Sequence, residues 1–524
     1  MSWSRLLDIR TVLAAIVVGA LACVGWQELS ADDPPPSDGT HLNRIFSYVQ
    51  QQMNDSSIPG AGLAIVNSDG SVQAKGFGED GHGNAITPDT PFWIGSNTKS
   101  FTALAIMQLH EAGKLDIDAP VQRYVPEFHV ANAEVSTAIT VKMLLNQTSG
   151  LSRADGIKPL LEGKEQTLEE AVADMATLRL NRPVGRTYEY SNLNFVIAGL
   201  IVERVSGQSW TDYVQTQIFD PLEMRNSYTS LDEAKANGLS AVHRYLFGFP
   251  VETDADYLPG LASTGYLYSS AGDMAHYLSM YLNGGVYNGR RLLSEQGIAA
   301  MLSGETNDSS RTLLGHSFDF EYGRGWFVGP FGAADDARWH LGDLYSFTAW
   351  MVLLPDTEQA VVVLMNAGSA FELAGATAPL SRIPIGVVNV LRGENPPAGM
   401  GFNRFYVIFD AAVLIVLALQ VWSLGRLVTR GLAPAGVAGW ATACVPFVWE
   451  LGVAGFLLLQ FPPVMGGGWQ AAIRTLPDLS LVVLAVSLLW LLTGVARAVQ
   501  LLRMTATSRA QQVASQPGQQ LHGA

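Results

Sequence analysis

Ser96-Asn97-Thr98-Lys99 is the stretch that decides how this chain folds and what it can do. A serine followed three residues later by a lysine places a hydroxyl and an amine one helical turn apart. Residues 91–95 predict a short strand that ends at a glycine, and residues 100–109 predict a helix that is apolar on most sides. We therefore expect Ser96 at a helix N-terminus, where free N–H groups and the helix dipole stabilise negative charge.

Lys99 is expected to point into apolar surroundings one turn further along this helix. Loss of hydration lowers the pKa of a lysine, and a neutral amine can accept the proton of a serine hydroxyl. The chain contains seven lysines and a single S-x-x-K sequence. So short a motif also arises by chance, in which case Ser96 only caps a helix and Lys99 lies at the surface. The other motifs decide between these interpretations.

The composition favours a soluble domain joined to membrane segments. The 524 residues have a net charge of −15, only 15% of them are charged, and the mean hydropathy is +0.18. The absence of a basic stripe argues against a nucleic-acid partner. Cys23 and Cys444 both lie in apolar runs, so no disulfide is expected in the soluble domain. The nine histidines are scattered without H-E-x-x-H, and we expect neither a metal nor a cofactor.

Residues 1–30 predict export from the cytoplasm. Two arginines precede an apolar run over residues 11–26, which is short for a membrane span and typical of a signal-peptide core. Residues 20–22 have the small-x-small form of a cleavage site; an uncleaved N-terminal membrane anchor and a lipoprotein modified at Cys23 are the alternatives. Residues 31–39 then form a polar, proline-rich linker.

Residues 40–395 are predicted to form one α+β domain. Strand pairs are expected near both of its ends, at residues 61–77 and 348–365, each around a polar turn. This order favours an antiparallel sheet covered by helices, with a helical insertion. The helices are expected at residues 42–53, 100–109, 168–180 and 195–205.

Residues 403–500 are predicted to form three transmembrane helices, because each of three apolar runs is long enough to cross a bilayer. The positive-inside rule places the flanking arginines in the cytoplasm and residues 40–395 outside. Residues 505–524 are expected to be a disordered cytoplasmic tail. The apolar runs are residues 405–424, 437–459 and 479–499, and the arginines are Arg426, Arg430, Arg497, Arg503 and Arg509.

Two carboxylates, Asp410 and Glu450, fall inside the predicted spans. Carboxylates at this depth are rare and are functional candidates by default. They either face water or each other near the interface, or line a polar patch beneath the soluble domain.

A second motif, Tyr190-Ser191-Asn192, precedes the helix predicted at residues 195–205. A tyrosine beside a lysine can exchange protons with a serine or with a leaving amine, and an asparagine two residues later can donate to a substrate carbonyl. The alternative is an aromatic loop that anchors the start of the helix, with Asn192 as its N-cap.

A third motif, His-Leu-Gly-Asp at residues 340–343, precedes a predicted strand. The second half of the chain contains no lysine, so a cationic or hydrogen-bonding group here has to be histidine or arginine, and His340 fits. Gly342 would let a substrate backbone approach, and the N–H of Asp343 could form an oxyanion hole with that of Ser96. The alternative for His340 is a structural histidine at a strand edge.

In this order, the three motifs resemble the three sequence boxes of the serine β-lactamase-related family, which includes class C β-lactamases, penicillin-binding proteins, D-aminopeptidases and esterases. The resemblance implies a β-lactamase/transpeptidase-like fold, with Ser96 as nucleophile, Lys99 as base and Tyr190 as proton shuttle. His340 would stand where many members carry lysine. Supporting stretches within the similar region, residues 40–370, are residues 113–121, 139–151, 221–224 and 263–274.

The whole layout is similar to that of periplasmic peptidases that remove an N-acyl-D-amino-acid cap from peptide natural products. We therefore expect a membrane-anchored extracytoplasmic serine hydrolase that acts through an acyl-Ser96 intermediate on amides or esters, above all on a D-amino-acid-containing peptide. A carboxylesterase of the same fold and an acylation-triggered membrane sensor without turnover are the alternatives. The expected partners are a small peptide or ester and membrane lipid.

One departure from the family concerns the residues after the third box. Many members carry glycines there, whereas residues 343–346 of this chain are Asp-Leu-Tyr-Ser. The edge of the pocket is therefore expected to be narrower and more acidic, and turnover of penicillin is not expected.

Overall fold

The computed structural model describes residues 41–254, 257–306, 310–313, 316–373, 379–432, 436–464 and 468–514. The predicted leader and linker, residues 1–30 and 31–39, lie outside the described residues. The described chain separates into two units, which divide between Tyr406 and Val407.

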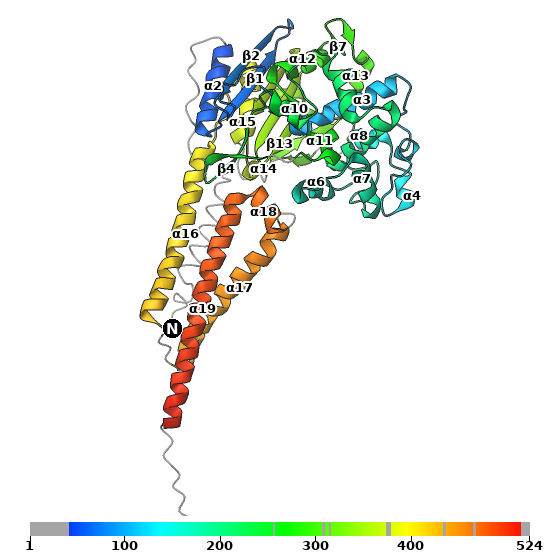
Figure 1. Ribbon diagram of the computed structural model, residues 1–524. Coiled ribbons are helices and arrows are strands. Elements are labelled where there is room, and N and C mark those ends of the chain that lie inside the picture. The colour runs from blue at the N-terminus through cyan, green and yellow to red at the C-terminus, as the bar shows by residue number, and fades with distance from the viewer. Residues whose placement is uncertain are drawn as a thin grey trace, which may run out of the picture. The chain divides into compact units, whose positions relative to one another are not determined.

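A seven-stranded antiparallel sheet forms the centre of the first unit (Figure 1). Strand β1 (Gly60–Val66) pairs along its length with β15 (Gln359–Met365), so the two ends of the unit meet in one sheet. The strand order is β11-β12-β13-β14-β15-β1-β2. The remaining strands of the sheet are β2 (Val72–Gly78), β11 (Glu321–Tyr322), β12 (Phe327–Phe331), β13 (Ala334–Leu344) and β14 (Phe347–Leu354).

Both predicted strand pairs are present, and their ends differ from the prediction by no more than one residue. The α+β class predicted from them is confirmed. The reason is local: each pair is an alternating or wholly apolar run folded around a short polar turn, a pattern that fixes hairpin pairing without help from distant residues.

Helices cover both faces of the sheet. Every residue of β1 and of β14 is buried, which requires apolar neighbours on either side. On one face Ala64, Met351 and Val362 belong to the large core that also contains α12. On the other face, α2 (His41–Asp55) packs on α15 (Pro379–Leu391), and α15 packs on β15.

Helix α3 (Thr98–Glu111) runs through the middle of this core, and each of its residues from Thr98 to Met107 is buried. The other helices of the unit are α4 (Ala133–Ser136), α5 (Val141–Leu145), α6 (Arg153–Glu162), α7 (Leu168–Ala173), α8 (Asn192–Ser206), α9 (Trp210–Val214), α10 (Leu231–Ala236), α11 (Ala262–Gly265), α12 (Ala271–Leu282), α13 (Glu295–Met301) and α14 (Ala370–Leu373). The short strands are β3 (Phe92–Trp93), β4 (Val242–Leu246), β5 (Phe249–Thr253), β6 (Tyr268–Ser269), β7 (Val286–Tyr287), β8 (Arg290–Arg291), β9 (Ser310–Leu313), β10 (His316–Asp319) and β16 (Ala367–Gly368).

The helix predicted at residues 168–180 is shorter than expected. Helix α7 ends at Ala173 and continues as a 3₁₀ turn over Asp174–Thr177. Leu178 is already extended, and its carbonyl accepts a hydrogen bond from the N–H of Ala131. A tertiary hydrogen bond thus ends the helix before its apolar pattern ends.

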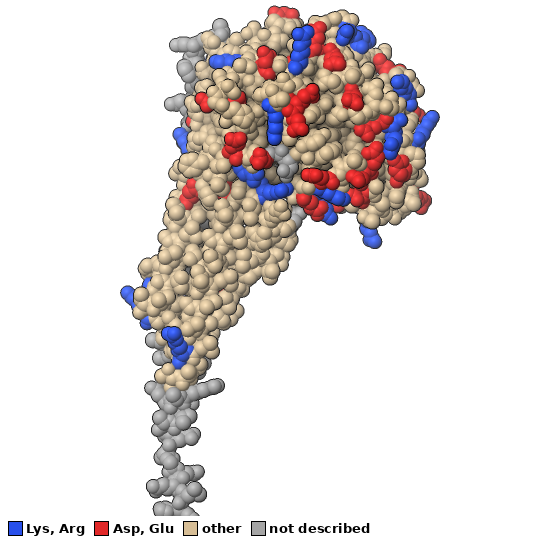
Figure 2. Space-filling view, viewed as in Figure 1, with Lys and Arg blue, Asp and Glu red and all other residues tan. Residues whose placement is uncertain are grey.

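The second unit contains three helices that are long and apolar enough to cross a membrane, at the places predicted from sequence. Figure 2 shows charged side chains scattered over the visible face of the first unit, whereas these helices carry few of them. The helices are α16 (Phe402–Arg430), α17 (Gly436–Val464) and α19 (Pro477–Ala514), and the short α18 (Trp469–Thr475) lies between the last two in sequence.

Glu450 of α17 and Arg497 of α19 form a buried ion pair with two hydrogen bonds. Arg497 Nε donates to Glu450 Oε2 at 3.1 Å, and Arg497 Nη2 donates to Glu450 Oε1 at 2.9 Å. Glu450 is therefore buried and paired with a residue of the third span, and Arg497 is not the free flanking charge that we expected. Pairing is the ordinary way to hold a charge inside a membrane segment.

Residues 505–514 correct the expectation of a disordered tail, because α19 continues to Ala514. No glycine or proline occurs between Gly494 and Pro517, and the hydroxyl of Thr507 donates to the carbonyl of Arg503 within the helix. The sequence therefore offers no signal that would end the helix earlier. Residues 515–524 lie outside the described part of the chain.

The ion pair yields a prediction about the second unit. Glu450→Leu leaves the Arg497 guanidinium buried without a partner and is expected to destabilise the unit by about 3–5 kcal/mol, whereas Glu450→Leu combined with Arg497→Leu is expected to cost much less. Thermal unfolding of the full chain in detergent, followed by circular dichroism, measures the difference. Two results would contradict the assigned pair. One is a melting temperature of Glu450→Leu equal to that of the wild type, and the other is a melting temperature of the double variant below that of Glu450→Leu.

Candidate active site

Ser96 lies in the 3₁₀ turn Gly95–Asn97, immediately before α3, as the sequence predicts. The turn depends on Gly95, whose φ is +53°, in the left-handed region that favours glycine. A Cβ at Gly95 would also lie 2.8 Å from the ring of Phe347 and 2.9 Å from the Cα of Gly342. The nucleophile turn therefore needs glycine both for its backbone conformation and for space.

Lys99 is fully buried and contacts Ser96. Its Nζ lies 2.9 Å from Ser96 Oγ, and it donates to the carbonyl of Thr264 at 2.7 Å. Burial lowers the pKa of Lys99 well below its usual value, and the positive charge of Arg153 lowers it further. A neutral amine keeps one N–H for Thr264 and presents its lone pair to the hydroxyl of Ser96.

Tyr190 completes the group of three catalytic residues predicted from sequence. Lys99 Nζ lies 5.0 Å from the centre of its ring, and the pKa of its phenol responds to the neighbouring hydroxyl of Ser96. Burial raises the pKa of Tyr190, while the neighbouring Ser96 hydroxyl and the charge of Arg153 lower it. Because burial dominates, the phenol holds its proton at neutral pH and is suited to passing protons onward rather than to serving as the resting base.

Gln147 holds the segment that carries Tyr190, and sequence reasoning missed it. It is fully buried, and its φ of +61° is uncommon for a residue other than glycine. Its Oε1 accepts hydrogen bonds from the N–H of Ser191 at 2.9 Å and from Asn194 Nδ2 at 2.5 Å. Its place within the family-like stretch 139–151 is the signal that could have marked it.

Asn192 is partly used by the fold. It is the first residue of α8, and Ser191 takes the N-cap position without a side-chain bond to the helix, so the N-cap interpretation of Asn192 is wrong. Asn192 Nδ2 donates to the carbonyl of Gly156 in α6 at 3.1 Å. The other hydrogen of the Asn192 amide could still be donated to a substrate carbonyl, and this role stays a prediction.

His340 does not face the substrate with a charge. The side chain is fully buried, with Nε2 2.9 Å from the hydroxyl of Tyr322 and Nδ1 2.8 Å from the carbonyl of Leu341. A carbonyl only accepts, so Nδ1 carries the proton and Nε2 accepts from Tyr322. Burial, helped by the charge of Lys99, lowers the pKa of His340 to about 3. This geometry fits the alternative interpretation, in which His340 is a structural histidine and not a cationic group of the site.

Gly342 serves the nucleophile turn rather than the approach of a substrate backbone. A Cβ at Gly342 would lie 1.9 Å from the carbonyl oxygen of Ile94 and 2.9 Å from the Cα of Gly95. Real Cβ atoms do not occur at such distances, so β13 and the turn before α3 can meet only at a glycine.

The pairing of β13 with β14 shows which way the backbone N–H of Asp343 points. Leu344 pairs with Phe347 across a two-residue turn, and the closing pair of such a hairpin exchanges hydrogen bonds. The N–H of Asp343, one residue earlier, therefore points away from β14, to the side on which β12 has ended. It remains a candidate to bind an oxyanion together with the N–H of Ser96.

The side chain of Asp343 is less acidic than expected. Burial raises its pKa well above the usual value, the negative charge of Glu372 adds to this, and the neighbouring Thr348 opposes it. The carboxyl therefore keeps its proton at a pH where a free aspartate is ionised. The expected acidic pocket edge is thus weakened by the surroundings of this group.

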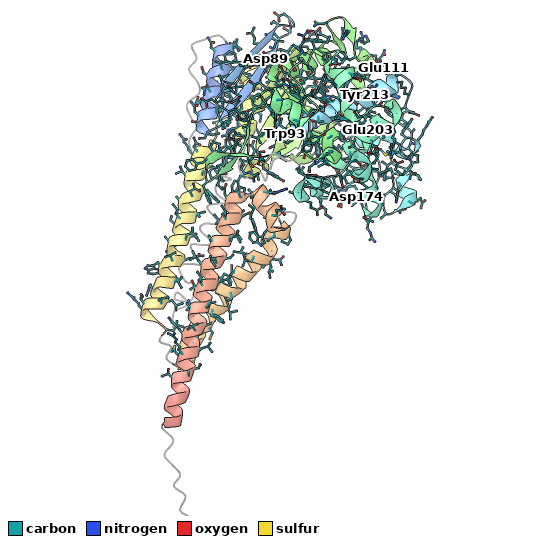
Figure 3. The ribbon with its side chains drawn as sticks, viewed as in Figure 1. Asp89, Trp93, Glu111, Asp174, Glu203 and Tyr213 are labelled. Carbon is teal, nitrogen blue, oxygen red and sulfur yellow. The ribbon has the colours of Figure 1, made fainter. Side chains whose placement is uncertain are left out.

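Aromatic packing fixes the turn from the side of the sheet. The ring of Trp93 in β3 (Figure 3) stacks on Phe347 with centroids 5.3 Å apart. Its Nε1 donates to the carbonyl of Gly265 at 3.0 Å. These contacts tie β3, β14 and α11 together around Gly95. Within the described residues, no three His, Cys, Asp or Glu side chains gather closely enough to hold a metal ion.

Comparisons with known proteins show which family the chain resembles. Residues 45–381 match the family described as Beta-lactamase. Protein flp of Staphylococcus aureus (strain MW2) is 25% identical over 415 residues, which cover 77% of this chain and 80% of that protein. Penicillin-binding protein 4 of Amycolatopsis lactamdurans is 33% identical over 272 residues, 51% of this chain and 70% of that protein.

Solved structures show the same fold. The octameric penicillin-binding protein homologue from Pyrococcus abyssi superposes with a TM-score of 0.56 at 28% identity, covering 68% of this chain and 78% of that one. A class C β-lactamase mutant gives a TM-score of 0.56 at 16% identity, covering 68% of this chain and 99% of its own. The predicted β-lactamase/transpeptidase-like fold is confirmed.

The buried histidine predicts a pH dependence of stability. The folded chain holds His340 neutral down to about pH 3, whereas an unfolded histidine binds a proton below about pH 6.5. Stability from this group is therefore full above pH 6.5 and falls as the pH drops, by about 2 kcal/mol at pH 5. His340→Gln should lose this slope.

Melting temperatures of the full chain in detergent at pH 7.5 and pH 5 measure the effect. The wild type is expected to lose roughly 2–3 °C more than His340→Gln over this range. His129→Gln, which removes an exposed histidine, is the matched control and should keep the wild-type slope. Equal slopes for His340→Gln and the wild type would show that His340 is not held neutral.

Proposed function

Because this chain belongs to the beta-lactamase family, whose members are serine hydrolases, we propose that it is a membrane-anchored hydrolase that acts outside the cytoplasm through an acyl-Ser96 intermediate. The observation that carries the proposal is the 2.9 Å contact between Lys99 Nζ and Ser96 Oγ. The buried phenol of Tyr190, whose pKa is lowered by the same hydroxyl, supports it.

Acylation would use the three side chains in turn. Lys99 removes the proton of Ser96 while Oγ attacks the substrate carbonyl, and the resulting oxyanion is held by the N–H groups of Ser96 and Asp343. As the tetrahedral intermediate collapses, Tyr190 gives a proton to the leaving amine or alcohol and is reprotonated from Lys99. Water then attacks the acyl-enzyme by the reverse route and regenerates Ser96.

The substrate class we propose is a peptide that contains a D-amino acid. The support is architectural: a domain of this family joined to three apolar helices is similar to the layout of exported peptidases with that specificity. A carboxylesterase is the second candidate, because the same acyl-enzyme serves esters and pocket shape alone separates the two. A sensor that is acylated without turnover is the third.

The membrane topology follows from charge. Arg426 and Arg430 at the end of α16, and Arg503 and Arg509 in the second half of α19, are expected on the cytoplasmic side, which leaves the catalytic unit on the other side. An exported hydrolase held at the membrane would meet substrates in the periplasm or at the cell surface.

The nucleophile is tested by covalent labelling. A fluorophosphonate probe should label the wild type and the exposed-serine control Ser68→Ala, and should not label Ser96→Ala. Lys99→Ala and Tyr190→Phe should each slow labelling about 100-fold or more because proton transfer is lost, while Lys114→Ala, at an exposed lysine, should not. Labelling of Ser96→Ala at the wild-type rate would remove the assignment.

The substrate class is tested by turnover of a matched panel: N-acyl-D-aminoacyl amides, their L-isomers, p-nitrophenyl esters and nitrocefin. We expect kcat/KM for the D-amides to exceed that for the L-amides at least tenfold, with little turnover of nitrocefin. Turnover confined to esters would favour the carboxylesterase, and a burst of labelling without any turnover would favour the sensor.

A further inference from the structure

The third motif brings no positive charge to this site. Neutral His340 is fully buried and bonded to Tyr322 and to the carbonyl of Leu341. Lys99 is occupied by Ser96 and Thr264. If the site recognises an anionic group of the substrate, the cation has to come from an element other than β13.

The first turn of α6 is bonded to the segment that carries Tyr190. The carbonyl of Ser152, the N-cap, accepts a hydrogen bond from Ser191 Oγ at 2.8 Å. The N–H of Arg153 donates to Glu189 Oε1 at 2.9 Å, and the carbonyl of Gly156 accepts from Asn192 at 3.1 Å. Three hydrogen bonds thus fix the start of α6 beside Tyr190.

The two elements are also packed closely. A Cβ at Gly156 would lie 2.7 Å from the backbone nitrogen of Asn192 and 2.8 Å from Ser191 Oγ. These contacts fix the backbone of Arg153, the first residue of α6, against the segment that carries Tyr190.

The Arg153 side chain is exposed, and among the described residues its guanidinium is in no ion pair. The neighbouring carboxylate is already used, because Glu189 Oε2 accepts from Arg182 Nε at 3.3 Å and from Asn181 at 2.8 Å. The charge of Arg153 nevertheless reaches the reacting groups, since it lowers the pKa of both Lys99 and Tyr190.

We propose that Arg153 binds a carboxylate of the substrate next to the scissile bond, so that α6 rather than β13 supplies the cation that selects the substrate. A guanidinium forms two parallel hydrogen bonds with a carboxylate, which fixes orientation as well as charge. The inference rests on the proposed hydrolase and narrows its substrates to peptides or esters that carry a carboxylate beside the bond that is cleaved.

Binding of that carboxylate has a second consequence. It neutralises the positive charge that opposes protonation of Lys99, so the pKa of the amine rises when the correct substrate is bound. Lys99 becomes a stronger base at the moment it has to remove the proton of Ser96. A neutral substrate would leave the amine as weak a base as in the free enzyme.

The experiment compares two esters that differ by one charge, an acyl ester of 3-hydroxybenzoic acid and the same ester of 3-hydroxybenzamide. The ratio of their kcat/KM values is measured for the full chain in detergent. Arg153→Gln is expected to lower the ratio of carboxylate to carboxamide ester at least tenfold, in keeping with loss of a charged hydrogen bond. Arg153→Lys should retain part of the wild-type preference for the carboxylate ester. Arg186→Gln, at an exposed arginine before the Tyr190 motif, should retain the whole preference.

The possible outcomes separate a failure of the Arg153 proposal from a failure of the proposed hydrolase. An unchanged ratio in Arg153→Gln overturns the inference, even if the pH profile of both esters shifts upward, because Arg153 would then act only on the pKa of Lys99. Where the wild type hydrolyses neither ester, competition of each ester with fluorophosphonate labelling gives the ratio of their affinities for the site, for which the same change is expected. Loss of all labelling at Ser96 would instead overturn the proposed hydrolase itself, which separates the two failures.

Discussion

A lysine amine without water around it is the condition on which the rest of this structure depends. Lys99 can act as a base on Ser96 only while it is uncharged. A lysine is uncharged at neutral pH only when burial destabilises its charged form enough to bring its pKa below the pH of the solution. The core supplies that burial: Lys99 is fully buried on a helix whose first ten residues have no exposed member. The sheet, helices α8, α11 and α12, and the aromatic packing around Trp93 exclude water from one amine.

Two glycines far apart in the sequence allow the turn that carries Ser96 to pack directly against strand β13. Gly95 and Gly342 meet with almost no space between their backbones, and a methyl group on either would collide with the other's element. The contact places Ser96 beside β13, whose next residue, Asp343, turns its N–H to the open side of the sheet. The proposed nucleophile, Ser96, and the proposed oxyanion donor, Asp343, thus come from opposite ends of the catalytic unit, which β1 and β15 join in one sheet.

Sequence patterns predicted the parts whose causes are local. The hairpins, α3, the three apolar helices and the S-x-x-K turn follow from periodicity, turn residues and a single glycine, and they occur where expected. Tertiary surroundings decided the rest. His340 reads as a cation in sequence and is neutral because it is buried against Tyr322; Glu450 finds its partner 47 residues away. Gln147 and Arg153 carried no motif of their own, since their roles arise from which loop and which helix start meet the Tyr190 segment.

The neutral state of His340 has an electrostatic consequence for the base. A charged side chain at that position of β13 would lie close enough to Lys99 to lower its pKa, as the coupling between the two groups shows. With neutral His340 that contribution is missing, and the positive charge that lowers the pKa of Lys99 comes instead from Arg153. A charge on a buried strand is fixed, whereas a charge on an exposed side chain at a helix start can be neutralised by what binds there. If Arg153 binds the substrate as we propose, a cation on the helix rather than on the strand makes the strength of the base depend on the ligand.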